Sequence, residues 1–232
     1  MKDKLFKTLI LLFFGFSPLF GEVSSTILSL DDTLGKIEHV ELQKFKSGVI
    51  VRDLGENSVI LGIAVYIGDD TIDIQKYTNL SQDSFPKLTS KVEAGDKVVF
   101  DIYNSRAMII APNGKEYSDF EKNLEGKSFV HSDILASYIN KEGTRVPKEK
   151  HFKKMCNGYS LGSIYFLIEN KSYEVDCNSF HIVDERDIKE TKIDDDMIPF
   201  YHRFEKLSKG LFNYEDDITD YATYYKELIG VK

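Results

Sequence analysis

Closely spaced segments rich in Val and Ile constrain the fold of the first half of this chain more than any other feature. Gly48–Val51 and Val59–Ile67 flank the turn-forming residues 54–57, which is the pattern of a β-hairpin. Further short segments of the same kind follow, separated by turns rich in Gly and Asp. Strands at such short spacing pair with their neighbours, so we predict a small antiparallel barrel over about residues 37–102, with Thr78–Lys91 as its one long loop.

After this segment the pattern mixes helices with strands. Arg106–Ala111 has the composition of a strand. The apolar residues Tyr117, Phe120 and Leu124 then recur at the spacing of an amphipathic helix. Ser132 stands where it can cap the next helix.

A second hairpin is predicted from Ser163–Glu169 and Ser172–Cys177. Apolar and polar residues alternate along its second arm, so the polar set should face water. That polar set is Ser172, Glu174 and Asp176. The preceding stretch Thr144–Lys154 is basic and contains a proline, and we expect it to be a loop.

The C-terminal part of the chain begins with a run of charged residues from Asp184. Pro199 can begin a helix that carries Phe200, Phe204, Leu207 and Leu211 on one face, and a second helical stripe runs to Ile229. The predicted fold class is therefore α+β, with mainly antiparallel strands. Its parts are a β-rich, barrel-like lobe at 22–104, an α+β lobe at 105–188, and a charged linker with C-terminal helices at 189–232.

The first 21 residues have the order of a secretory signal peptide. Lys2, Lys4 and Lys7 precede the almost wholly apolar run Leu9–Phe20, and the small residue Gly21 follows it. This run is shorter than the roughly 20 residues that a membrane-spanning helix needs. We expect cleavage after residue 21 and export to the periplasm or the outer cell surface, without a transmembrane segment in the mature chain. An uncleaved N-terminal anchor is the alternative.

The chain is acidic, with 38 Asp and Glu against 30 Lys and Arg and a formal net charge of −8. Removal of the basic leader makes the remainder more negative still. Such a charge disfavours binding to nucleic acids and to anionic membranes. The partners that it favours are cationic surfaces, or surfaces that bind a carboxylate. Other envelope proteins are a further expected class of partner.

The two cysteines, Cys156 and Cys177, are expected to form a disulfide because the chain is exported. Both flank a β-type segment, so the bridge should join the two ends of a hairpin. A catalytic thiol or a two-cysteine metal site is the alternative, but no histidine stands at ligand spacing.

One motif resembles an active-site sequence. Residues 158–162 read Gly-Tyr-Ser-Leu-Gly and so fit the nucleophile elbow of α/β-hydrolases, with Ser160 as the nucleophile. The elbow needs a strand before the serine and a helix after it, whereas a strand pattern follows Gly162. We therefore expect no catalytic residues and no enzymatic activity.

The histidines are scattered and give no metal-binding pattern. They are His39, His131, His151, His181 and His202. The acidic clusters lack the spacing of a calcium loop. No metal ion and no other cofactor is expected.

Four tyrosines near the C-terminus lie on two faces of one predicted helix, so they cannot all pack against a single core. They are Tyr214, Tyr221, Tyr224 and Tyr225. We expect them to contribute to a surface that binds a partner.

Five blocks of the sequence carry a resemblance to a known family. They are Ile110–Tyr117, Phe129–Leu135, Cys156–Gly162, Cys177–Phe180 and Pro199–Tyr201. In these blocks the chain resembles the N-terminal domain family of bacterial plasminogen-binding surface proteins. The resemblance extends from about Ile37 to Tyr225 and is clearest around the two cysteines.

The resemblance implies an exported cell-envelope protein that captures host plasminogen. Longer members of the family carry a Lys/Glu-rich extension after the domain, and their binding is associated with a terminal lysine. This sequence departs from that pattern because no such extension follows the domain. It does end in a lysine, and Lys232 is therefore the expected ligand-binding residue. The alternative function is a periplasmic scaffold or assembly subunit of an envelope machine, with the tyrosine-bearing helix as its docking surface and no host ligand.

Overall fold

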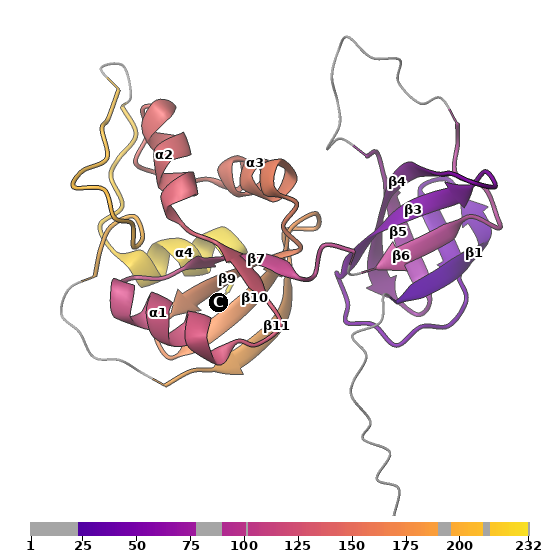
Figure 1. The fold of residues 1–232 in the computed structure, drawn as a ribbon, viewed down its shortest axis with the longest axis horizontal. Coiled ribbons are helices and arrows are strands. Elements are labelled where there is room, and N and C mark those ends of the chain that lie inside the picture. Colours follow the sequence, from indigo (N-terminus) through magenta and orange to yellow (C-terminus); the bar gives the residue numbers. More distant parts are fainter. Residues whose placement is uncertain (1–22, 78–89, 101, 190–195, 211–213, 232) are drawn as a thin grey trace, which may run out of the picture.

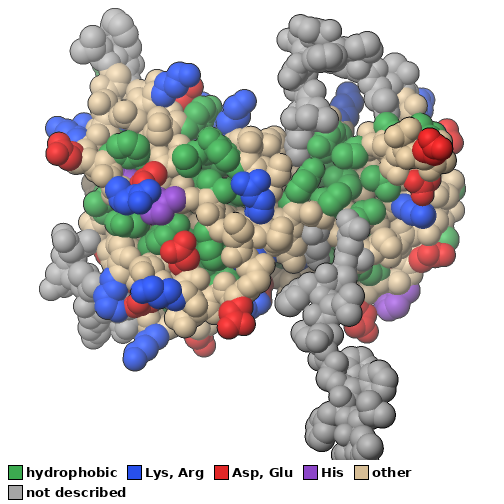
Figure 2. Space-filling view, viewed as in Figure 1, with side chains coloured by type: hydrophobic (Ala, Val, Ile, Leu, Met, Phe, Trp, Pro, Cys, Tyr) green, Lys and Arg blue, Asp and Glu red, His purple; other side chains and the backbone are tan. Residues whose placement is uncertain are grey.

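The computed structural model describes residues 23–77, 90–100, 102–189, 196–210 and 214–231. The predicted signal peptide at 1–21, most of the predicted loop Thr78–Lys91 and the terminal Lys232 lie outside the described residues. The described part forms two lobes joined at a narrow waist (Figure 1, Figure 2).

The first lobe is a closed barrel of six antiparallel strands, in the order β1-β2-β5-β4-β3-β6. Closure comes from β6, which returns to pair with β1. The predicted hairpin is confirmed, since β3 pairs with β4 and sets Val49 opposite Ile63. Ile50 and Phe100 point into the barrel and are fully buried there. The strands are β1 (Ser24–Asp31), β2 (Leu34–Ile37), β3 (Ser47–Asp53), β4 (Ser58–Gly68), β5 (Thr71–Gln75) and β6 (Lys97–Phe100).

The second lobe is built on a five-stranded mixed sheet in the order β11-β10-β9-β7-β8. Strand β7 is parallel to both of its neighbours, β8 and β9, whereas β9, β10 and β11 form an antiparallel meander. The predicted hairpin of two arms corresponds to β9 and β10. The strands are β7 (Arg106–Ile110), β8 (Ser128–Val130), β9 (Ser163–Ile168), β10 (Lys171–Asp176) and β11 (Ile182–Asp187).

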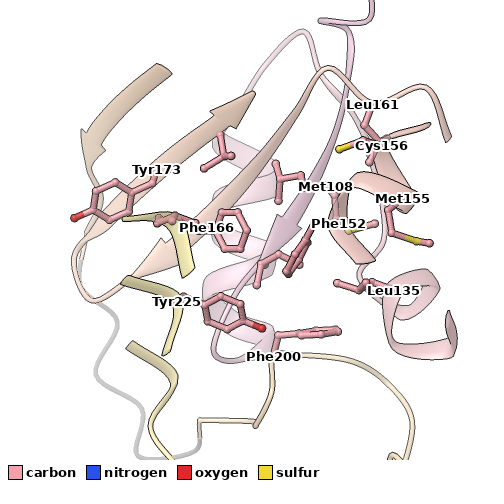
Figure 3. Packing of buried hydrophobic residues seen from close by; sticks show 14 of the residues in the cluster. Met108, Leu135, Phe152, Met155, Cys156, Leu161, Phe166, Tyr173, Phe200 and Tyr225 are labelled. Atoms are coloured by element: carbon pink, nitrogen blue, oxygen red, sulfur yellow. The ribbon is translucent and has the colours of Figure 1, made fainter. Parts of the chain in front are cut away.

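Helices cover both faces of this sheet. One face packs against α1 (Gly114–Asn123) through Tyr117, which is buried beside Ile109 and Leu167. The opposite face carries the main core under α2 (Asp133–Lys141), α3 (Glu149–Tyr159) and α4 (Tyr221–Ile229). Figure 3 shows the ring of Tyr225 in this core, close to Phe152, Phe166 and Phe200. The predicted α+β class, with mainly antiparallel strands and a barrel before an α/β lobe, is confirmed.

The prediction of a loop at Thr144–Lys154 is wrong, because α3 begins at Glu149. Its buried residues His151, Phe152, Met155 and Cys156 have helical spacing, but they are interleaved with lysines that lie on the outer side. The high lysine content of the segment therefore hid its apolar face from the sequence analysis.

The prediction of a helix that begins at Pro199 is also wrong, and α4 is the one C-terminal helix within the described ranges. The backbone N–H groups of Met197 and Tyr201 donate to Pro112 and Ala111, not to carbonyls one helical turn back. Phe200 is buried nonetheless, so its spacing reflects contact with the second lobe and not helical periodicity.

The helices of the described part are all short. None of them is both long and apolar enough to cross a lipid bilayer.

Candidate functional site

The five blocks that carry the family resemblance gather in two places. Cys156–Gly162 and Cys177–Phe180 meet beside the junction between the lobes, where Gly162 and Asn178 line a small cavity. Ile110–Tyr117, Phe129–Leu135 and Pro199–Tyr201 meet at the carboxyl ends of β7 and β8.

At the first place a disulfide joins Cys156 to Cys177, with an S–S distance of 2.01 Å, as predicted. Cys156 lies on α3 and Cys177 follows β10 directly. The bridge therefore ties a helix to the sheet, and the expectation that it joins the two ends of one hairpin is wrong. The cause of that error is the unrecognised helix α3.

Asp176 is the centre of the junction. Its Oδ2 accepts hydrogen bonds from the backbone N–H and the hydroxyl of Ser47, at 3.0 and 2.9 Å. Its Oδ1 accepts from the backbone N–H groups of Asn178 and Ser179, both at 2.9 Å. Burial raises the pKa of this carboxyl, and the four hydrogen bonds act in the opposite direction. Because Ser47 opens β3 of the barrel, one carboxylate holds donors from both lobes.

A charged group beside Asp176 strengthens the same junction. Glu174 lies between Lys46 of the barrel and Lys127 of the second lobe, with N–O distances of 3.9 and 3.6 Å. Burial alone would raise the pKa of Glu174, but Lys127 and Lys46 outweigh that effect and hold it below its usual range. Phe45 of the barrel also stacks on His181, with the ring centroids 4.3 Å apart.

The expectation that the polar set of the second hairpin faces water is therefore wrong. Ser172, Glu174 and Asp176 are 3%, 8% and 3% exposed. Alternation correctly separated the two faces of β10, but a polar face can also meet another part of the protein if its groups find partners there. For Glu174 and Asp176 the barrel and Lys127 supply those partners, and the hydroxyl of Ser172 donates to the Arg186 carbonyl on β11 at 3.5 Å.

The second place is the edge of the sheet where the parallel strands β7 and β8 end. In α/β sheets this edge is where ligands usually bind. Here the segment Met197–Arg203, called the strap below, lies against it. Tyr201 N–H donates to Ala111 at 2.8 Å, and the Ser132 hydroxyl donates to the Tyr201 carbonyl at 2.7 Å. A Cβ on Gly114 would stand 2.8 Å from the Tyr201 ring, so the strap needs glycine there.

Ser132 thus has a different role from the one predicted. It precedes α2, but its side chain makes no capping hydrogen bond to that helix and holds the strap instead.

A group of aromatic and charged side chains surrounds the strap. The Tyr117 and His131 rings lie 4.7 Å apart, and Arg203 donates to Asp133 through its backbone N–H at 2.8 Å and its Nε at 2.5 Å. The backbone N–H of Asp133 donates to Nδ1 of His131 at 3.1 Å, and the same nitrogen lies 3.3 Å from Oδ1 of Asp133. Burial lowers the pKa of His131 despite the nearby Asp133. These contacts fix the strap in place and leave its edge of the sheet occupied by the protein's own chain.

Ser160 lies at the end of α3, in the left-handed conformation with φ 53°, and β9 follows it. The order of elements is helix, turn and strand, the reverse of a nucleophile elbow. Gly162 has a structural reason of its own, because a Cβ there would stand 2.7 Å from the carbonyl oxygen of Tyr103.

The remaining histidines lie in separate environments. His39 contacts Asp70 on the barrel at 3.1 Å, whereas His151 is a buried residue of α3 and His202 a buried residue of the strap. In the ranges that the structure describes, no three His, Cys, Asp or Glu residues are close enough together to hold a metal ion.

The four C-terminal tyrosines do not form a common surface. Tyr221 and Tyr225 are core residues, 4% and 0% exposed, and the hydroxyl of Tyr221 donates to the Ile110 carbonyl at 3.0 Å. Tyr224 is partly buried, and its hydroxyl donates a hydrogen bond to the Pro147 carbonyl. Tyr214 is 87% exposed and stands apart from α4. The core accepts more of these rings than expected because α4 packs directly on β9.

Sequence reasoning missed Ser47 and Lys46, whose partners are more than a hundred positions away in the chain. No local signal could have found them. It also missed the outer side of α3, which the helical spacing of Phe152 and Cys156 could have revealed.

Comparison with known proteins gives a consistent result. Residues 22–229 match the family model described as "Plasminogen-binding protein pgbA N-terminal". The chain is 28% identical over 215 residues to plasminogen-binding protein PgbA of Helicobacter pylori strain 26695, covering 89% of this chain and 47% of that protein. The protein of the same name from strain J99 is 27% identical over the same length and shares. The chain thus spans about half the length of these relatives. No solved structure matches it.

Proposed function

This chain belongs to the family of plasminogen-binding protein PgbA N-terminal regions, and we propose on that premise that it binds plasminogen at the envelope of the cell that exports it. The observation that carries the proposal is the extent of the match. It begins just before β1 and ends at the last residue of α4, so it takes in the barrel and the second lobe together. The polar contacts of Asp176 and Glu174 join those lobes into one unit that can present a partner surface.

Export is part of the proposal. It is supported by the basic and apolar leader of the sequence and by the disulfide between Cys156 and Cys177, a bond that persists in oxidising compartments. Protease treatment of intact cells tests it. A surface receptor would be removed, whereas a periplasmic scaffold without a host ligand would be spared.

Lys232 enters the proposal through its chemistry. When a chain ends at this lysine, one residue offers both an ε-ammonium and a free α-carboxylate, which is the pair of charges that lysine-binding kringle modules recognise. An internal lysine has to take its anion from a neighbouring acid.

The test is surface plasmon resonance on immobilised plasminogen, with the protein comprising residues 22–232 and the same protein lacking Lys232. Binding of the first that a lysine analogue competes away supports the proposed function. Weaker binding of the second assigns the contact to Lys232, and equal binding removes that residue from the mechanism. No binding by either protein favours the scaffold.

The proposed function requires no catalysis. The reversed order of elements at Ser160 and the strap that occupies the carboxyl ends of β7 and β8 support this view. Labelling with a serine-directed fluorophosphonate tests it. Label on the wild-type protein that is lost in Ser160→Ala would establish a reactive serine and contradict the proposal.

A further inference from the structure

We propose that the outer side of α3 is a second, internal lysine site, in which Lys150 and Lys154 engage a lysine-binding module of plasminogen. The inference rests on the proposed function and adds to it a surface that is separate from Lys232. It places the contact on α3, in a segment where the sequence pattern predicts a loop.

The geometry of α3 separates its two sides. His151, Phe152 and Met155 face the core, and Cys156 forms the disulfide. Lys150 and Lys154 are one turn apart and both exposed. Within the described ranges neither ammonium has a hydrogen bond or an ion pair, whereas the neighbouring lysines form ion pairs with carboxylates.

Two lysines next to this pair illustrate the difference, because each forms an ion pair. Lys153 pairs with Glu149 at 2.8 Å along the same helix, and Lys148 pairs with Glu215. The charges of Lys150 and Lys154 therefore remain uncompensated on a chain whose formal net charge is −8. The charge of Lys150 acts on the buried side of the helix: burial lowers the pKa of His151, Lys150 and Lys148 lower it further, and Glu142 and Glu215 oppose them.

The helix that presents these lysines is held firmly. Cys156 is bridged to Cys177, and the imidazole of His151 accepts a hydrogen bond from the backbone N–H of Lys148 at 2.9 Å, which secures the first turn. A partner that binds this side loses little free energy to ordering the backbone, because the backbone is already ordered. Only the two lysine side chains have to be fixed.

The absence of internal partners also points to an external one. Like charges one turn apart on a helix repel each other, and no ion pair among the described residues offsets that repulsion at Lys150 and Lys154. Some exposed lysines elsewhere, such as Lys115 with Asp119 and Lys226 with Glu169, would have to break an ion pair before they could enter a pocket lined by carboxylates. Lys150 and Lys154 meet no such obstacle. Lys76 and Lys122 are exposed as well and form no ion pair with any described residue, but they lie in different lobes and do not form a pair one helical turn apart.

The experiment uses the protein comprising residues 22–232 and immobilised plasminogen. The test variant is Lys150→Gln/Lys154→Gln. The control is Lys76→Gln/Lys122→Gln, which makes the same change of charge on the barrel and on α1, across the sheet from α3 (Figure 1). We expect the test variant to bind about tenfold more weakly and the control to bind like wild type. Circular dichroism checks that both variants fold.

The outcomes separate this inference from the function on which it rests. No binding by the wild-type protein overturns both. Wild-type binding that the test variant retains overturns the internal site and leaves the proposed function standing. Equal losses in test and control variants would assign the effect to overall charge, and that result also overturns the site. Deleting Lys232 in each background then shows whether the two contacts act separately, with the internal site accounting for the binding that remains.

Discussion

Ser47 of the barrel and Asp176 of the sheet, 129 positions apart in the sequence, are joined by two hydrogen bonds to the same carboxylate oxygen. One comes from the backbone of Ser47 and cannot be removed by a change of side chain. The other comes from its hydroxyl, which also accepts a hydrogen bond from the amide of Asn178 at 2.9 Å. The contact is buried, so each of its groups depends on the others for a partner.

Ser47→Ala should lower the free energy of unfolding by about 2 kcal/mol, because a buried hydrogen bond to a charged group is lost. Ser58→Ala is the control, since that hydroxyl donates to the exposed Asp53 at 2.6 Å and should matter little. Urea denaturation measures both. Similar small losses in the two variants would show that the junction contributes little to stability.

Gly162→Ala should destabilise the protein by about 1–3 kcal/mol, because its new methyl group would meet the backbone of Tyr103 at 2.7 Å. Gly158, in the same Gly-Tyr-Ser-Leu-Gly motif, has nothing within 4 Å of its would-be Cβ and lies in α3. Gly158→Ala should therefore stabilise the helix by roughly 0.5–1 kcal/mol. Thermal unfolding of the two variants should show a lower midpoint for Gly162→Ala and a higher one for Gly158→Ala. Midpoints that shift in the same direction would contradict the close contact between Gly162 and Tyr103.

Loss of the disulfide should cost about 3 kcal/mol, the value expected for a loop of this length in the chain-entropy picture. The comparison is denaturant unfolding of wild type with and without reductant, beside the variant Cys156→Ser/Cys177→Ser. Reductant should leave the variant unchanged. Alkylation of unreduced protein followed by mass analysis should find no modified cysteine, and two modified thiols would show that the bridge does not form.

Acidification should weaken the fold below about pH 6.5. Burial lowers the pKa of His131, His151 and His202 from an ordinary value of 6.5. The folded state keeps these rings neutral, while the unfolded state binds protons as the pH falls, so the free energy of unfolding decreases between 6.5 and the lowered values. Urea midpoints at pH 7 and pH 5 measure the loss. His151→Gln should reduce it, and a midpoint that stays constant between the two pH values would contradict the prediction.

The local patterns of the chain predicted the elements that depend on neighbouring residues. The pairing of β3 with β4 follows from two Val- and Ile-rich segments around a short turn, and α1 follows from the spacing of Tyr117 and Phe120. In both cases the interacting residues lie close together in the sequence, across one turn of a hairpin or within a few turns of a helix. The fold class could therefore be predicted correctly.

The parts that could not be predicted depend on distant partners. Glu174 and Asp176 look like surface residues of a two-faced strand until Lys46 and Ser47 are placed against them. Phe200 looks like a residue of a helix until the strap is seen to donate its hydrogen bonds to Ala111 and Pro112. No pattern of period two or of helical period contains that information.

The division of the donors of Asp176 between two lobes has a consequence for mapping antibody epitopes with fragments of the chain. A fragment that ends before Arg106 would turn the polar groups of Ser47 toward water, and one that begins there would leave the Asp176 carboxylate with two of its four donors. Each fragment would display a face that the intact molecule covers. Sera raised against such fragments would recognise them better than the native protein, and antibodies that span the waist would be found only with the whole chain.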